Sequence, residues 1–330
     1  MIRNIGRYIL RNQVILALLI IATGWLVLQT LTIWAVLFTA YIIMTGFMPL
    51  VNWLIARKVP KMLAIALPYL ITLILIVLLI IPTLPLFIDQ VHSLLNNFPD
   101  YMNKTAKLLN LKVSDNQFQT FLTSQLNSIG ENIVAVTGQI FGAFFAILTL
   151  FVISFYMLID HERIKRNITE LFPRRYQSYI HAVIVEAEQK LGAWLRGQLI
   201  LSLVIGLCTW IALSLVGMKY ALPLSLIAGV GEVIPTVGPI ISAIPAIIIA
   251  LNISPTMAGI VALIYILIQF AENHLIVPKV MQRAIGLHPL FTILTILIGG
   301  QLMGVLGALL AIPLVAFCSV FITNLEKSSE

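Results

Sequence analysis

Charged side chains are scarce in this sequence. Only 10% of the 330 residues are Asp, Glu, Lys or Arg, whereas a soluble globular domain carries roughly 25%. A chain with so little charge cannot cover a water-exposed surface, which excludes an ordinary soluble protein. Cysteine is also rare, because Cys208 and Cys318 are the only two, and both lie in apolar stretches without a neighbouring Cys or His. Neither a disulfide framework nor a zinc site is therefore expected.

Sequence signatures of catalysis are missing as well. The chain has no G-x-x-x-x-G-K-[ST] phosphate loop, no G-x-S-x-G nucleophile elbow and no H-E-x-x-H metal pair. We therefore expect no enzyme activity, no catalytic residues, no cofactor and no bound metal. The formal net charge is +7, but no stretch of the chain combines basic residues with aromatic ones. Nucleic acid is therefore not an expected partner. The basic residues instead indicate topology and contact with anionic lipids.

Long apolar stretches are what the sequence does contain. Hydrophobic residues make up 60% of the chain and form blocks such as 14–20, 70–81, 133–159 and 289–323. Blocks of about 20 apolar residues are typical of membrane helices, whereas a membrane β-barrel needs short segments of alternating polarity. The sequence therefore predicts an all-α, polytopic helical membrane protein in the lipid bilayer of a bacterial inner membrane.

The uneven distribution of basic residues predicts the topology. Three arginines precede the first apolar stretch and three basic residues lie at 57–61, so both flanks are expected in the cytoplasm. The chain must then cross twice before residue 57, and we predict a turn near 25–32. Seven basic residues at 160–196 against three at 89–131 predict that the first of these segments is cytoplasmic and the second external.

The predicted organisation has five regions, with both termini in the cytoplasm. These are N-terminal membrane helices at 1–88, including a span at 62–88, an external amphipathic helical cap at 89–131, a membrane span at 132–159, cytoplasmic or interfacial amphipathic helices at 160–196, and a C-terminal transport core with broken helices at 197–323. The cap is too small for a core of its own, so we expect it to pack on the membrane part or on a neighbouring subunit of a homo-oligomer. In 160–196 an apolar helical face lies opposite Glu186, Glu188 and Lys190 and comprises Tyr176, Ile180, Val183, Ala187, Leu191 and Trp194.

Two apolar stretches near the C-terminus, 220–251 and 289–323, are too long for one span and too short for two. Each is interrupted by helix-breaking residues: Gly229, Gly231, Pro235, Gly238 and Pro239 in the first, and Gly299, Gly300, Gly304, Gly307 and Pro313 in the second. Paired interruptions of this kind indicate discontinuous helices at a transporter's binding site. We predict about six full spans plus two re-entrant hairpins, and the alternative is eight full spans.

Glu232 lies within the first of these stretches, just before Pro235, Gly238 and Pro239. Burial of a carboxylate in hydrocarbon costs about 2.5 kcal/mol or more, so this side chain should face a cavity, a partner or a proton. The functional interpretation is a proton or cation site at the helix break. The structural alternative is a carboxylate that caps the half-helix beginning near Pro235.

A second polar cluster comprises Gln269, Glu272, Asn273 and His274. Gln269 lies three residues before Glu272 and four before Asn273, and this spacing predicts a shared helical face. That face could line a solute path, although residues at a helix end can also simply lie among lipid headgroups. Five further positions are candidates for gating or for an interface: Pro278, Gly286, His288, Gly299 and Gly300. Arg196 and Gln198 open a membrane span, where Arg196 is expected to act mainly as an interfacial anchor.

Several motifs occur in a fixed order along most of the chain: LGAWLRGQLILSLVIG from Leu191, GEVIPTVGPIISAIPA from Gly231, FAENHLIVPKVMQRAIGLHPL from Phe270 and AIPL at Ala311. With these motifs the chain resembles the autoinducer-2 exporter family of bacterial membrane proteins. The resemblance implies a secondary transporter without an ATPase, because members are linked to export of autoinducer-2 or to exchange of sodium or lithium for protons. The family's motif positions correspond to Gly231, Pro235, Gly238 and Pro239, and later to Asn273, Pro278, Gly286 and Pro289.

The expected function is therefore secondary transport of a small polar solute, such as autoinducer-2, coupled to a proton or cation gradient. A sodium (lithium)/proton antiporter is the first alternative. An oligomeric channel and a non-transporting membrane scaffold are the others.

Overall fold

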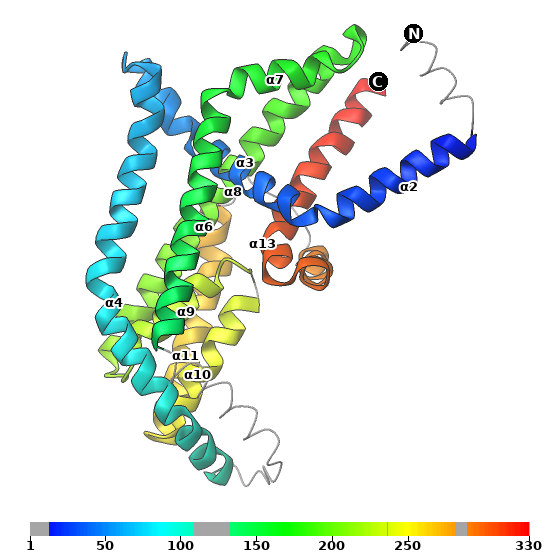
Figure 1. The fold of residues 1–330 in the computed structure, drawn as a ribbon. Coiled ribbons are helices and arrows are strands. Elements are labelled where there is room, and N and C mark those ends of the chain that lie inside the picture. Colours follow the sequence, from blue (N-terminus) through cyan, green and yellow to red (C-terminus); the bar gives the residue numbers. More distant parts are fainter. Residues whose placement is uncertain (1–12, 109–132, 236, 281–288, 330) are drawn as a thin grey trace.

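The computed structural model describes residues 13–108, 133–235, 237–280 and 289–329, and these residues are almost entirely helical (Figure 1). No strand occurs among them, which confirms the all-α prediction. Of the cap predicted at 89–131, residues 109–131 lie outside the described residues. The same is true of Gly286 and His288.

Four helices of the N-terminal part lie among the described residues. α2 (Gln13–Gln29) and α3 (Leu31–Ala56) are separated by the single residue Thr30, which lies within the turn predicted at 25–32. α4 (Lys61–Leu108) has 48 residues and continues well past the predicted end of its span at residue 88. α6 (Ile133–Ile159) coincides with the span predicted at 132–159.

Aromatic packing holds α3, α4 and α6 together. The ring of Tyr69 on α4 lies 4.4 Å from the ring of Phe47 on α3 and 5.8 Å from that of Phe151 on α6, measured between centroids. Its hydroxyl forms a 2.6 Å hydrogen bond with the hydroxyl of Ser154. A buried phenol needs such a partner, so this contact fixes the relative position of α4 and α6.

The C-terminal part begins with α7 (His161–Glu170) and α8 (Arg174–Leu215). α8 is one uninterrupted helix of 42 residues, so the predicted boundary between 196 and 197 falls inside a continuous element. The predicted apolar face of its first half is confirmed at Val183, Ala187, Leu191 and Trp194, which are buried. It is wrong at Tyr176, which is exposed, because that residue lies in the first turn of α8.

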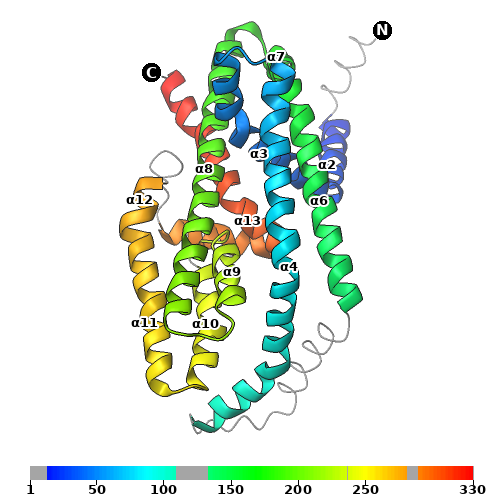
Figure 2. The same ribbon diagram turned by 90° about the vertical axis from the view of Figure 1, so that its left-hand side faces the viewer.

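The remaining elements fold back and forth beside α8. They are α9 (Ala221–Gly231), α10 (Val237–Leu251), α11 (Pro255–Ala271), the π-helix η1 (Glu272–Ile276), α12 (Val277–Val280) and α13 (Pro289–Ser329). Figure 2 shows α8 running from the end of the molecule that carries α7, here called the α7 end, to the opposite end. α9 then returns to mid-height, α10 leads back to the opposite end, and α11 rises again (Figure 2).

Both apolar stretches predicted to be interrupted are broken. α9 and α10 are separate helices, and α13 has non-helical angles at Met303 (φ −140°, ψ 19°) and Gly304 (φ 61°, ψ −142°). The first part of α13, in orange, crosses the middle of the molecule, and the second part, in red, rises toward the α7 end (Figure 2). The two parts touch at Gly299 and Gly307, where a Cβ on Gly307 would overlap the carbonyl oxygen of Gly299.

Six helices among the described residues are long and apolar enough to cross a membrane. They lie in Leu31–Ala56, Lys61–Leu78, Gly142–Ile159, Arg174–Leu215, Pro255–Val280 and Leu290–Phe321. The number matches the prediction of about six full spans. Only 17 residues of α2 are described and they are not among the six, so the span predicted there is not tested. The last of the six contains the break at Met303–Gly304. Large apolar side chains such as Leu28, Leu203 and Leu297 are exposed on the outer surface, as contact with lipid requires.

Candidate functional site

The site lies where the tip between α9 and α10 meets α8 and the end of α11. The two arms of this hairpin approach so closely that a Cβ on Gly238 would overlap the carbonyl oxygen of Gly231. α9 also lies tightly against α8, because a Cβ on Gly229 would be only 2.9 Å from the carbonyl oxygen of Ser202. Glycine at these positions brings the residue after α9, Glu232, directly against α8.

Glu232 is almost completely buried, with 1% of its surface exposed. Its carboxyl group lies near that of Glu272, at the start of η1, so that their charges interact. Glu272 is also buried, with 4% exposed, and it accepts a 3.1 Å hydrogen bond from the side-chain amide of Gln269. Two carboxyl groups in such contact cannot both be ionised without strong repulsion.

Gln198 connects α8 to this pair. Its side-chain nitrogen donates a 2.6 Å hydrogen bond to the backbone carbonyl oxygen of Glu232. Three buried side-chain oxygens, two on α8 and one on the residue after α9, have no hydrogen-bonding partner within the described residues: Gln198 Oε1, Ser202 Oγ and Glu232 Oε2. Buried polar atoms without partners are rare in proteins and point to a ligand or a functional role. The same part of the chain contains no group of three or more His, Cys, Asp or Glu side chains that could hold a metal ion.

The capping interpretation of Glu232 does not agree with the hydrogen bonds at the start of α10. The N–H of Val237 donates to the carbonyl oxygen of Pro235 at 2.8 Å, and the N–H of Gly238 donates to that of Ile234 at 3.0 Å. The next residue, Pro239, has no N–H. The first donors of α10 are therefore satisfied by backbone of the turn, and the Glu232 carboxylate does not cap them.

Asn273 does not join the other predicted residues of its cluster. Gln269 and Glu272 share a face and a hydrogen bond, as their spacing predicted, but Asn273 is exposed. The reason is the π-helix η1, which widens the turn and rotates the later residues of the helix. It lies just before Pro278, whose missing N–H leaves a carbonyl without its helical partner. Pro278 itself is exposed on α12.

Arg196 holds α3 rather than lying free at the interface. Its guanidinium donates to the backbone carbonyl oxygens of Thr45, at 3.4 Å, and Gly46, at 3.1 Å. Pro49 lies within α3 and has no N–H to donate to the carbonyl four residues earlier, that of Thr45. Arg196 therefore satisfies a carbonyl that the proline leaves without its helical partner.

The remaining predicted residues lie at the two breaks. Pro235 is half-buried in the tip, and Pro239 lies half-buried in the first turn of α10. Gly299 and Gly300 are half-buried before the break in α13, where Gly299 touches Gly307. Ile234 of the tip packs in the same apolar cluster as Met303 of the α13 break, although no hydrogen bond among the described residues joins this break to Glu232.

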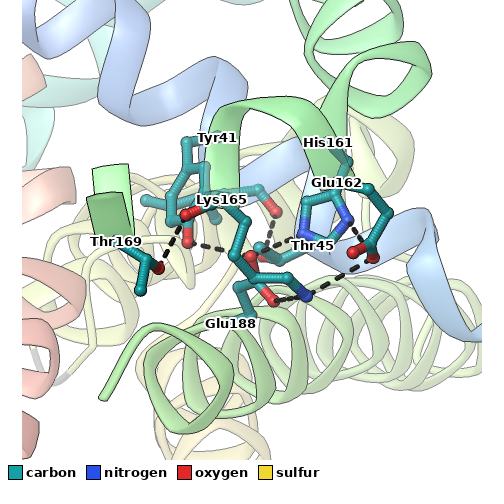
Figure 3. A network of polar contacts seen from close by, with 8 residues as sticks. Tyr41, Thr45, His161, Glu162, Lys165, Thr169 and Glu188 are labelled. Atoms are coloured by element: carbon teal, nitrogen blue, oxygen red, sulfur yellow. Dashed lines mark hydrogen bonds and ion pairs between the residues drawn. The ribbon is translucent and has the colours of Figure 1, made fainter. Parts of the chain in front are cut away.

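No sequence pattern indicated a second buried polar network, which lies at the α7 end (Figure 3). Glu188 on α8 has only 6% of its surface exposed. Its carboxylate lies 2.6 Å from His161 Nε2, 3.4 Å from the hydroxyl of Tyr41, which donates to it, and 4.0 Å from Lys165 Nζ. The sequence placed Glu188 opposite the apolar face of its helix, and α7 folds over this side of α8, so the carboxylate is buried.

Glu162 lies at the edge of this network and remains mostly exposed, 3.4 Å from Lys165 Nζ. Burial works toward a higher pKa for its carboxyl group, but the charges of Lys165 and His161 outweigh it and lower the pKa from its usual value. Glu162 thus lies beside Lys165 and His161 at the edge of the network. A pattern of i, i+3 spacing could have predicted the contact with Lys165, but not the contacts with α8.

Comparison with known proteins decides the family. The model of the AI-2E family of transporters matches residues 15–327, which is nearly the whole chain. The chain belongs to the AI-2E transporter family. A relative from Bacillus subtilis strain 168, the candidate transport protein YueF, is 30% identical over 300 residues, covering 85% of this chain and 81% of the relative. A second relative from that strain, the candidate transport protein YrrI, is 29% identical and covers 91% of this chain and 88% of its own length.

One relative has a named solute. The AI-2 transport protein TqsA of Escherichia coli K12 is 24% identical over 277 residues, covering 81% of this chain and 78% of TqsA. Family membership confirms the resemblance inferred from the motifs. Together with the six long apolar helices, it identifies the chain as a multi-pass membrane protein of a bacterial transporter family.

Proposed function

We propose that this protein is a secondary transporter that moves a small polar solute across the inner membrane and couples that movement to protons through Glu232 and Glu272. The observation that carries the proposal is the contact between these two carboxyl groups at the break between α9 and α10, where Glu232 is 1% exposed. Buried acids inside a membrane protein are costly and typically serve ion or proton pathways.

The chemistry of the pair favours a proton as the coupled ion. With one proton shared, the pair carries a single negative charge, and loss of that proton would place two negative charges side by side. The tip would then be driven away from η1, because only separation or a cation relieves the repulsion. A change of this kind, at the ends of broken helices near mid-height, is how alternating access operates in other secondary transporters.

The lining of the site is consistent with a neutral, hydrogen-bonding solute. Along α8, Ser202 lies four residues after Gln198, and Thr209 lies seven residues after Ser202, so the three follow one face of the helix. The hydroxyls of Ser202, Thr209 and Tyr265 are buried and have no partner among the described residues. Autoinducer-2, the solute in the name of TqsA, is rich in oxygen, and we propose it as the first solute to test.

Sodium (lithium)/proton antiport is the second candidate, and one observation favours it. The unpartnered buried atoms Gln198 Oε1 and Glu232 Oε2 are both acceptors, and oxygen ligands suit hard cations. An oligomeric channel and a non-transporting scaffold stay alternatives from the sequence. Assembly as a homo-oligomer, expected from the sequence, stays a prediction.

The deciding experiment is a flux assay in proteoliposomes with an imposed pH gradient, run separately with autoinducer-2 and with sodium. We expect the wild type to accumulate one of these and Glu232→Gln to reduce flux to the level of empty liposomes. Glu170→Gln is the matched control, because Glu170 is exposed on α7. Normal flux in Glu232→Gln would refute the coupling role, currents without saturation would indicate a channel, and no flux of either compound in the wild type would favour a scaffold.

For the topology we propose that the α7 end faces the cytoplasm and that the α9–α10 hairpin is re-entrant from outside. The proposal is supported by the basic residues of α7 and by the end of α13, which rises to the same end (Figure 1). It predicts that Lys279, exposed on α12, lies on the cytoplasmic side. Labelling of Lys279→Cys by an impermeant thiol reagent in intact cells would contradict this arrangement.

A further inference from the structure

A cavity of about 940 Å³ opens at the α7 end, separate from Glu232. Residues from α3, α4, α6, α7 and α8 line it, among them Thr45, Lys61, His161, Lys165, Glu188 and Arg196. Its volume is in the range of about 300–1,000 Å³ that is typical of small-molecule sites. Part of the network in Figure 3 forms one wall.

The acidic residues of this cavity already have basic partners. Glu188 lies 2.6 Å from His161 Nε2 and 4.0 Å from Lys165 Nζ. Glu162 lies 3.4 Å from Lys165 Nζ, and Lys190, another lining residue, pairs with Glu186 at 3.0 Å. Among the described residues, no carboxylate that lines the cavity is therefore left to neutralise further cations.

Two cationic side chains in the same lining have no acidic partner within the described residues. Lys61 Nζ donates to the backbone carbonyl oxygen of Ile159 at 3.2 Å, and Arg196 donates to the backbone carbonyls of Thr45 and Gly46. Both donations of Arg196 come from one terminal nitrogen, although a guanidinium has five N–H donors. Its other terminal nitrogen and its Nε remain available for a planar, two-oxygen ligand.

The position of Lys61 adds to the positive potential. Lys61 is the first residue of α4, so the cavity wall includes the positive end of a 48-residue helix, whose first N–H groups lack helical partners. A half-buried Arg, a Lys and a helix N-terminus on one cavity are the combination that binds carboxylate and phosphate groups.

We propose that this cavity is an oxyanion-binding site, in which Arg196 and Lys61 hold the carboxylate or phosphate group of a small molecule or of an anionic lipid headgroup. The proposal does not rest on the transport mechanism, because the hydrogen bonds of both residues go to α3 and α6 rather than to Glu232 or Glu272. The bound group supplies the negative charge that the side chains of the lining lack.

The test uses the purified full-length protein in lipid nanodiscs and measures the unfolding temperature. One arm titrates inorganic phosphate, at constant ionic strength, into discs of phosphatidylcholine. The other arm increases the fraction of phosphatidylglycerol in phosphate-free discs. A saturable rise in the first arm identifies a free oxyanion, and a saturable rise in the second alone identifies a lipid headgroup; either outcome supports the site if the variants below agree.

Lys61→Gln should raise the half-saturating concentration by about tenfold or more, the usual effect of removing one charged hydrogen-bond donor. Lys190→Gln is the matched control, because it removes the same charge from the same cavity but from a lysine already paired with Glu186. Arg196→Lys keeps the charge and removes the fork of donors, so it should weaken binding less than the double variant with Lys61→Gln. No saturable rise in either arm, or equal losses in Lys61→Gln and Lys190→Gln, would overturn the proposal.

Discussion

Glu188 and Glu232 are both buried acids that meet other helices in polar contacts, yet their surroundings are opposite in charge. Glu188 lies among His161, Lys165 and the hydroxyl of Tyr41. Glu232 lies against another acid, Glu272, and an amide side chain, Gln198, which donates to its backbone. One carboxylate is compensated by cations of this chain, and the other is not.

This difference separates stabilising from functional burial. A compensated acid joins α3, α7 and α8 in one arrangement, because its partners lose their own compensation if they separate. An acid without a basic partner favours a change in protonation or ion binding, because a proton or another cation must supply the positive charge that the protein does not. The two sites therefore predict opposite responses to mutation.

The largest effect is expected from Glu188→Ala. Removing one partner of a buried ion pair costs roughly 3–5 kcal/mol, and here it leaves His161 and Lys165 facing an empty position on α8. Chemical unfolding of the detergent-solubilised protein should register this loss. Glu170→Ala, a change on the exposed face of α7, is the control, and an equal effect of both variants would show that the Glu188 network contributes little.

The tip that carries Glu232 offers the next largest effect. Gly238→Ala would bring a Cβ into the carbonyl oxygen of Gly231, and such overpacking costs about 1–3 kcal/mol. The control is Gly259→Ala on α11, where no atom lies within 4 Å of the new Cβ and the better helix propensity of Ala should be neutral or favourable. Both are measured by unfolding and by flux; a neutral Gly238→Ala would contradict the close contact of the hairpin arms.

A smaller effect is expected where α3 meets α8. Pro49→Ala restores an N–H to α3. This N–H can donate to the carbonyl oxygen of Thr45, which would then no longer depend on Arg196 for a hydrogen bond. A double-mutant cycle of Pro49→Ala with Arg196→Met should give a coupling energy of about 1 kcal/mol. The same cycle with Pro245, the proline inside α10, should give none, and similar coupling in both cycles would refute the link between Arg196 and Pro49.

The smallest effect on stability should come from the change with the largest effect on transport. Glu232→Gln should alter the free energy of unfolding by less than about 1 kcal/mol, because a neutral amide can donate to Glu272 as the shared proton does. The measurement is the same unfolding experiment used for Glu188→Ala. A loss as large as in that variant would assign Glu232 a structural role and remove the contrast between the two acids.

Much of the fold could be predicted from local patterns. The apolar stretches indicated the helices, the turn near Thr30 was implied by the length of helix that a bilayer can hold, and glycine and proline marked both breaks. Glu232 was identifiable because a carboxylate is conspicuous among apolar residues. The pairing of Gln269 with Glu272 was implied by helical spacing.

The contacts that depend on distant segments could not be predicted in the same way. The burial of Glu188 could not be predicted, because nothing in its own helix reveals that α7 covers it. The contact of Glu232 with Glu272 joins residues 40 positions apart, and the exposure of Asn273 depends on a π-helix that no simple periodicity indicates. The external cap and the oligomer stay predictions.

α8 has a mechanical consequence. Its 42 residues extend about 63 Å at 1.5 Å per residue, and Arg196 and Gln198 are two residues, or about 200°, apart on its circumference. This one continuous helix therefore contacts α3 on one side, through Arg196, and Glu232 on nearly the opposite side, through Gln198. Any rotation of α8 about its axis moves both side chains together. The hydrogen bonds of Arg196 to α3 and of Gln198 to the hairpin tip therefore cannot change independently.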